Sequence, residues 1–133
     1  MFSQEVVDRA CMAASEPMSY GRDDCCQWVR GVVLSSGGPD LMMGLPAYIS
    51  AAEAGLLIAR EGRGCLLRMA FKIADRLDLR QAPAPFTDGL VGVVLGERGP
   101  SLALRHNGAW LARAERGIAV MPDRLCAVAW EVF

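Results

Sequence analysis

The nonapeptide YGRDDCCQW, from Tyr20 to Trp28, marks the start of a helix and raises the question of what its two thiols do. Asp23 and Asp24 are residue types that favour a helix N-cap, and apolar side chains at helical spacing follow them. A thiol in the first turn of a helix lies near unpaired amides and the positive end of the helix dipole, which favour the thiolate. Three interpretations of Cys25 and Cys26 are therefore open: a reactive nucleophile, a pair of metal ligands, or two small buried side chains.

The rest of the N-terminal half also has a helical pattern of apolar residues. The stripe that starts at Ser3 is closed by Glu16-Pro17, because the residue before proline avoids the helical region of backbone angles. Ser50 is a good N-cap for a third helix, and the Gly62-Arg-Gly64 stretch separates that helix from a fourth. The expected helices cover residues 3–14, 24–34, 51–60 and 65–77.

Beyond the proline-containing linker at residues 81–88, short apolar segments alternate with turn residues. Asn107-Gly108 is a strong hairpin signal, because both residues tolerate the positive φ that a type I′ turn requires. The expected strands cover residues 90–95, 101–105, 109–113, 117–121 and 127–133. Helices followed by an antiparallel meander predict an α+β fold. We expect one domain over residues 1–133, with a helical part at 1–80, the linker at 81–88 and a sheet part at 89–133.

Composition and charge narrow the class of protein. The chain has 133 residues, of which 53% are hydrophobic and 22% are charged, and its formal net charge is −1. These values predict a globular domain with no electrostatic attraction to nucleic acid. Acidic residues stand where a signal peptide would have its basic region, and no apolar run is long enough to span a bilayer. We therefore expect synthesis in a cytoplasm without a signal peptide, no membrane insertion, and five reduced cysteines.

Catalysis by a cysteine nucleophile needs a base within hydrogen-bond reach, and the chain offers a single histidine, His106. It precedes the Asn107-Gly108 turn, where its ordinary interpretation is an exposed turn residue. A metal site has less support, because the sequence lacks a Cys-x-x-Cys pair and adjacent cysteines rarely both bind one tetrahedral ion. We therefore predict neither a metal nor a cofactor, and a metal-binding assembly module that uses several of the five thiols is a third hypothesis. The apolar loop from Leu41 to Pro46 is the best candidate for a contact with another protein.

The pattern aromatic-Gly-Arg-x-Asp-Cys, here Tyr20 to Cys25, resembles the cysteine helix of the NlpC/P60 superfamily, papain-like cysteine hydrolases of cell-wall peptides. Over nearly its whole length the chain is similar to short phage and prophage proteins related to NlpC/P60, which are typically encoded among tail genes, including those of gene transfer agents. Further features follow along the chain in the same order as in those proteins. They are Ser36 to Asp40, Tyr48 with the next helix, the short strands, and the ending from Ala127 to Val132.

This resemblance implies a papain-like NlpC/P60-type core with Cys25 at the nucleophile position. It places the superfamily histidine near Ser101, whereas His106 lies at the far end of the same strand, roughly 17 Å away at 3.3 Å per residue. The implied function is that of a structural component of a tailed-phage virion, in the distal tail or tail tip, with other tail proteins as partners. The alternative is an active cysteine peptidase or amidase that cleaves peptidoglycan during DNA entry, with His106 as its base.

Overall fold

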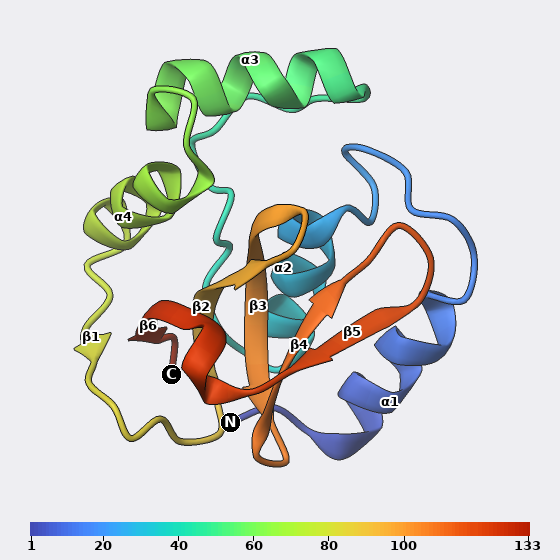
Figure 1. Ribbon diagram of the computed structural model, residues 1–133, viewed down its shortest axis with the longest axis vertical. Helices are drawn as coiled ribbons and strands as arrows, with labels where there is room; N and C mark the ends of the chain where they lie inside the picture. The colour runs from blue at the N-terminus through green and yellow to red at the C-terminus, as the bar shows by residue number, and fades with distance from the viewer.

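The structure, a computed structural model that describes residues 1–133, places four helices before an antiparallel sheet (Figure 1). The helices are α1 (Gln4–Ala13), α2 (Cys25–Ser35), α3 (Ala51–Gly62) and α4 (Leu66–Arg76). The strands are β1 (Gln81–Ala82), β2 (Leu90–Gly96), β3 (Gly99–His106), β4 (Ala109–Arg113), β5 (Ile118–Met121) and β6 (Cys126–Glu131), with a short 3-10 helix η1 (Asp123–Leu125) before β6. This order confirms the predicted α+β class.

Helices α1, α2 and α3 each begin at a side-chain cap, and the caps of α2 and α3 are of the kind expected from the sequence. The Asp24 carboxylate accepts from the amides of Cys26 and Gln27, and Ser3 and Ser50 cap α1 and α3 in the same manner. Each cap gives a partner to amides that have none within the helix, an effect worth about 1 kcal/mol. The cap at Asp24 makes the next residue, a cysteine, the first of α2.

The sheet has the strand order β1-β6-β2-β3-β4-β5 with antiparallel neighbours. Strands β2 to β5 form the expected meander, and Asn107 and Gly108 take φ values of 52° and 80° in the turn between β3 and β4. The expected meander is wrong for β6, which returns to lie between β1 and β2. The physical reason is that β2 is buried almost throughout, so its second edge needs a hydrogen-bonding partner. Part of the expected linker, Gln81–Ala82, pairs with β6 as β1.

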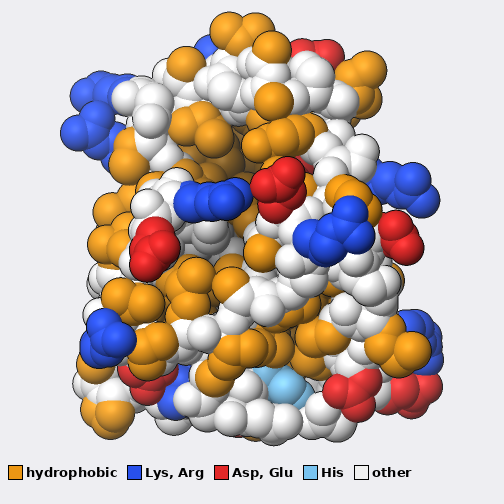
Figure 2. Space-filling model, turned by 45° about the vertical axis from the view of Figure 1, so that its right-hand side comes forward, with side chains coloured by type: hydrophobic (Ala, Val, Ile, Leu, Met, Phe, Trp, Pro, Cys, Tyr) orange, Lys and Arg blue, Asp and Glu red, His pale blue; other side chains and the backbone are white.

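Helix α3 lies at one end of the molecule and packs mainly against α4 (Figure 1). Its Leu57 is buried, whereas Leu56 on the neighbouring position is exposed. The turn into α4 uses two residues in the left-handed region, Arg63 and Gly64. Figure 2 shows that the surface is hollowed beneath this end of the molecule, with hydrophobic side chains in the hollow and charged ones just below it. No helix has both the length and the apolar character needed to cross a membrane.

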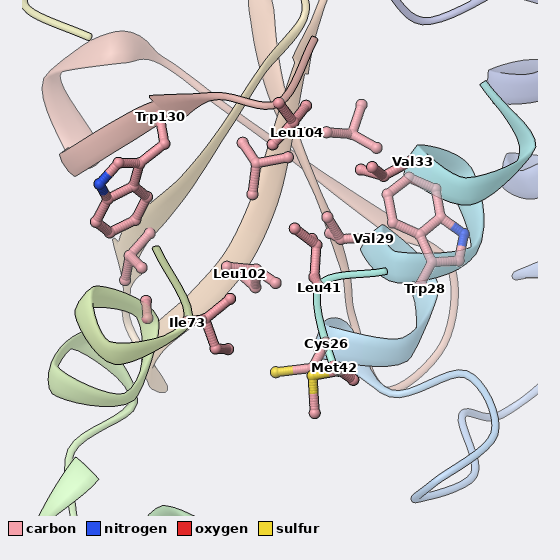
Figure 3. Packing of buried hydrophobic residues seen from close by; sticks show 14 of the residues in the cluster. Cys26, Trp28, Val29, Val33, Leu41, Met42, Ile73, Leu102, Leu104 and Trp130 are labelled. Carbon is pink, nitrogen blue, oxygen red and sulfur yellow. The ribbon is translucent and has the colours of Figure 1, made fainter. Parts of the chain in front are cut away.

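The main hydrophobic core fills the space between α2, α4 and one face of the sheet (Figure 3). Val29 and Val33 of α2 and Leu104 of β3 are completely buried there, and Trp130 of β6 belongs to the same cluster. Burial of one such side chain contributes about 1.5–3 kcal/mol, so this layer fixes α2 firmly against β3. A smaller cluster around Trp110 occupies the other face of the sheet.

The first two residues of the loop from Leu41 to Pro46, the expected protein contact, belong to the core. Leu41 and Met42 are buried against α2 and the sheet, and of this Met-Met pair only Met43 is exposed. The reason is an ion pair that fixes the start of the loop to α2. Arg30 of α2 donates two hydrogen bonds to the Asp40 carboxylate, at 2.6 and 2.9 Å. The prediction of a contact surface at this loop is therefore wrong for Leu41 and Met42.

Candidate functional site

A cavity of about 1180 Å³ lies between α3, the N-terminus of α2 and the turn that joins β2 to β3. Cys25, Cys26 and Ser101 are part of its wall, and most of the remaining lining is hydrophobic. Charged residues gather on the strand-turn side, where the lining includes Glu97, Arg98, Glu115 and Arg116. Pockets that hold drug-sized ligands measure about 300–1,000 Å³, so this cavity has room for a ligand or a peptide segment.

The Tyr20 to Cys25 motif fixes the first turn of α2 through the buried Asp24 carboxylate. One carboxylate oxygen accepts from the Gly21 amide at 2.7 Å, and the other accepts from the Tyr48 hydroxyl at 2.9 Å as well as from the helix amides. Gly21 has a φ of 82° and lies so close to Tyr48 that a Cβ would be 1.7 Å from its carbonyl oxygen. The aspartate, the glycine and the tyrosine together therefore set the position of Cys25.

The preceding residue, Asp23, anchors the same loop to β4. The side chain of Arg113 is 0% exposed and donates from Nη2 to Asp23 Oδ2 at 2.9 Å and to the Glu16 carbonyl at 2.6 Å. The Nη1 atom donates to two further carbonyls, and the Nε atom is buried without a partner. Sequence reasoning missed Arg113 as a site residue and named Tyr48 only as part of the resemblance, because neither lies near the cysteines in the chain.

The two thiols have opposite roles in the site. Interaction with the neighbouring Cys26 thiol is the main reason that the pKa of Cys25 is lowered. The backbone at Leu102 lowers that pKa too, and together these effects outweigh burial and the charge of Asp24, which raise it. The same interaction and complete burial raise the pKa of Cys26. The directions of the two pKa shifts make Cys25 the more acidic thiol of the pair.

The contact with Leu102 arises because β3 and β4 separate. Their pairing runs only from Leu104 to His106 on β3, so β4 does not pair with the earlier residues of that strand. The first turn of α2 lies against this part of β3. Ser101, the next residue along the strand, lines the same cavity as Cys25.

The structure does not bring His106 to the thiols. Its Nε2 atom is 2.9 Å from Gln4 Oε1, which also accepts from the Asn107 side chain at 2.9 Å. Four residues separate it from Leu102, a distance of about 13 Å along a strand. The expectation of an exposed turn residue is wrong, because His106 ends β3 beneath α1 and is only 9% exposed. This position is too far from Cys25 for direct proton transfer.

One oxygen of Asp24 and the two sulfurs of Cys25 and Cys26 lie within 4.8 Å of one another, which is close enough to hold one metal ion. Both carboxylate oxygens, however, already accept hydrogen bonds from Gly21, Tyr48 and the helix amides. A metal bound by Asp24 would have to displace the cap that starts α2. The donor set is therefore better suited to fixing the helix than to binding an ion.

The fold and the site thus define an α+β domain in which a thiol at a helix N-terminus meets an antiparallel sheet beside a largely apolar cavity. Residues 3–132 match the family described as a domain of unknown function, DUF6950, and the chain belongs to this family. Neither a curated protein nor a solved structure matches the chain.

The interaction between the thiols predicts a clear effect of Cys26→Ala on the reactivity of Cys25. Loss of this interaction destabilises the thiolate, so the pKa of Cys25 should rise by about one pH unit, and alkylation near pH 7 should slow about tenfold. The measurement is the rate of iodoacetamide addition to Cys25 between pH 6 and pH 10, followed by peptide mapping. Cys26→Ser keeps a hydroxyl donor and serves as the control, with a much smaller change. An unaltered pH profile for Cys26→Ala would contradict the assigned role.

Proposed function

We propose that this protein is a structural component of a tailed-phage virion, in the distal tail or tail tip, built on an NlpC/P60-like domain with an incomplete catalytic pair. The observation that carries the proposal is the environment of Cys25. Its thiol touches β3 at Leu102, beside Ser101, and Ser101 is where the resemblance puts the histidine of the superfamily. The only histidine of the chain is bound to Gln4 at the opposite end of β3.

A domain with a nucleophile position but no histidine nearby is suited to a binding or assembly role. A thiolate can attack without a base, but hydrolysis of the resulting intermediate requires a group that activates water. In the proposed role, the helices and the sheet act as a scaffold, and the partners are other tail proteins. The protein is made in the host cytoplasm and becomes part of the virion tail when the particle assembles.

The test of this role is mass spectrometry of purified phage-like particles from a host that encodes the chain. The expected result is that the protein copurifies with the tail proteins in a fixed ratio through a density gradient. Particles in which the gene is deleted should lack complete tails in electron micrographs. Absence of the protein from intact particles would overturn the proposal.

The second candidate function is an active cysteine peptidase or amidase that acts on peptidoglycan. The observation in its favour is the lowered pKa of Cys25 in the wall of a large cavity. Purified protein is therefore to be incubated with cell walls, with Cys25→Ser as the control. If the native protein releases peptides and the Cys25→Ser variant does not, the protein is an active hydrolase. The proposal of an incomplete catalytic pair would then be wrong.

Ser101→His tests whether Ser101 occupies the position of the missing base. An imidazolium beside the thiolate stabilises it, so alkylation of Cys25 at pH 6 should become about tenfold faster than in the native protein. Val120→His, on an exposed position of β5, is the matched control and should leave the rate unchanged. Equal rates for the two variants would show that position 101 does not face the thiol.

A further inference from the structure

Helix α3 carries apolar side chains on the face that is exposed to solvent as well as on the face that contacts the protein. On the inner face Leu57 is buried and Ile58 lines the hollow beneath the helix. On the outer face Leu56 is 65% exposed, and Ala52 and Ala59 are exposed as well. Figure 2 shows hydrophobic side chains over this end of the molecule. Because a helix that is apolar all round is normally buried on both sides, the outer face of α3 lacks a partner.

The outer face of α3 combines these apolar residues with two opposite charges. At 3.6 residues per turn, five residues fall within about one third of the helix circumference with Leu56 at the centre, namely Ala52, Glu53, Leu56, Ala59 and Arg60. Glu53 lies in the first turn and Arg60 in the last, on the same side of Leu56 and about 10 Å apart along the helix axis. Both are exposed, and neither forms an ion pair within the chain.

From this pattern we infer that the outer face of α3 is a dimer contact, on which a second copy of the chain packs its own α3 antiparallel across a two-fold axis at Leu56. A two-fold axis brings the same surface of both copies together. In an antiparallel pair, Glu53 of each copy then lies opposite Arg60 of the other, because the two residues lie at opposite ends of the helix. Two equivalent ion pairs therefore flank the contact between the two Leu56 side chains.

The complementarity of this face with itself is the reason to assign a second copy as its partner. In a parallel pair, Glu53 would lie beside Glu53 and Arg60 beside Arg60, so the charges specify the antiparallel arrangement. Gly55 lies at the edge of the same face, where a Cβ would meet no atom within 4 Å. Glycine inside a helix is less favourable than alanine, and no contact within the chain requires it here. Its missing side chain allows the backbone of a second helix to approach closely.

The size of the contact predicts a weak dimer. Helix α3 has 12 residues, and a pair of such helices buries less than the roughly 1,600 Å² of a standard interface. We therefore expect a dissociation constant of about 10–100 µM, with monomers in dilute solution. The inference does not rest on the proposed role in a virion, because the association is measured with the purified protein alone. The two can therefore fail separately.

Sedimentation equilibrium of the full-length protein between about 5 and 500 µM tests the dimer, and the native protein should change from monomer to dimer over this range. Glu53→Arg places two arginines opposite each other at both ion pairs, and Arg60→Glu does the same with two glutamates. Each variant alone should therefore associate at least about tenfold more weakly than the native protein. The two variants mixed in equal amounts should form a heterodimer with about native affinity, because every arginine then faces a glutamate.

The double variant Glu53→Arg/Arg60→Glu has the native net charge and is the control for non-specific attraction between oppositely charged chains. It should associate about as well as the native protein, since the ion pairs form again with their charges exchanged. Far-UV circular dichroism of each variant checks that the helices are retained. All of the substituted side chains are exposed, so we expect native spectra.

Leu56→Glu tests the centre of the contact. It removes the apolar side chain and places two like charges at the two-fold axis, so association should weaken at least about 100-fold. Leu34→Glu, at a 44% exposed leucine of α2, is the matched control and should dimerise like the native protein. Amide hydrogen exchange of α3 should slow as the concentration of native protein rises, and it should not change with concentration in Leu56→Glu.

Three results would overturn the inference. The first is native protein that remains monomeric up to about 500 µM, since this is well above the expected dissociation constant. The second is a dimer that Leu56→Glu leaves intact, because the contact would then lie elsewhere. The third is native association by the single charge variants, or failure of the mixed variants to form a heterodimer. Either of these would show that Glu53 does not face Arg60 of a second copy.

Discussion

Replacement of Arg113 by methionine is expected to lower the free energy of unfolding by about 3 kcal/mol. Loss of one partner from a buried ion pair costs about 3–5 kcal/mol. The lower end applies here, because the side chain of Asp23 is 32% exposed and water partly solvates it. The Glu16 carbonyl also loses its donor. For a chain of this length the midpoint of thermal unfolding should fall by about 10 °C.

Circular dichroism with urea as denaturant measures the change, and Arg98→Met is the matched control. Arg98 also forms an ion pair, with Glu115 at 3.3 Å, but its side chain is 88% exposed. Exposed pairs contribute about 0–1 kcal/mol, so this variant should differ little from the native protein. If Arg113→Met were as stable as Arg98→Met, the loop between α1 and α2 would not depend on β4 for its position.

The second large effect is expected for Gly21→Ala, which should lower the free energy of unfolding by about 3 kcal/mol. An alanine at a φ of 82° is strained, at about 1 kcal/mol, and its Cβ would meet the Tyr48 carbonyl oxygen at 1.7 Å. Relief of this overlap requires a backbone shift, which adds about 1–3 kcal/mol. Because the shift moves the first turn of α2, alkylation of Cys25 at neutral pH should slow as well.

Gly37→Ala separates the two contributions to this effect. Gly37 has a φ of 87°, but a Cβ there would meet no atom within 4 Å. Only the backbone strain applies, so its free energy of unfolding should fall by about 1 kcal/mol, with no change at Cys25. Urea titration of both variants under the same conditions gives the difference. Equal losses for Gly21→Ala and Gly37→Ala would contradict the close approach to Tyr48.

The helices and strands could be predicted from the sequence because their signals are local. The caps at Asp24 and Ser50 and the Asn107-Gly108 turn each act within a few residues, and the structure follows them. The return of β6 beside β2 could not be predicted in this way. It depends on which strand edge remains unpaired, and that is decided by the whole sheet.

In the site, too, the local features could be predicted from the sequence, whereas the long-range contacts could not. The position of Cys25 at the start of α2 follows from its neighbours in the chain. Its contact with Leu102, the Tyr48 hydrogen bond to Asp24 and the Arg113 bond to Asp23 join segments that are far apart in sequence. The spacing of apolar residues along the chain does not reveal contacts of this kind. The burial of His106 also escaped prediction, because it depends on Gln4 at the other end of the chain.

The attachment of α3 has a consequence for how molecules reach Cys25. This helix packs mainly against α4 and buries few of its side chains, and a left-handed turn at Arg63 and Gly64 joins the two. Segments held by so few apolar contacts open with free energies well below that of global unfolding. We expect amide hydrogens of α3 to exchange with solvent faster than those of α2. The local opening equilibrium of one helix would then change the width of the hollow beside Cys25, independently of the stability of the rest of the fold.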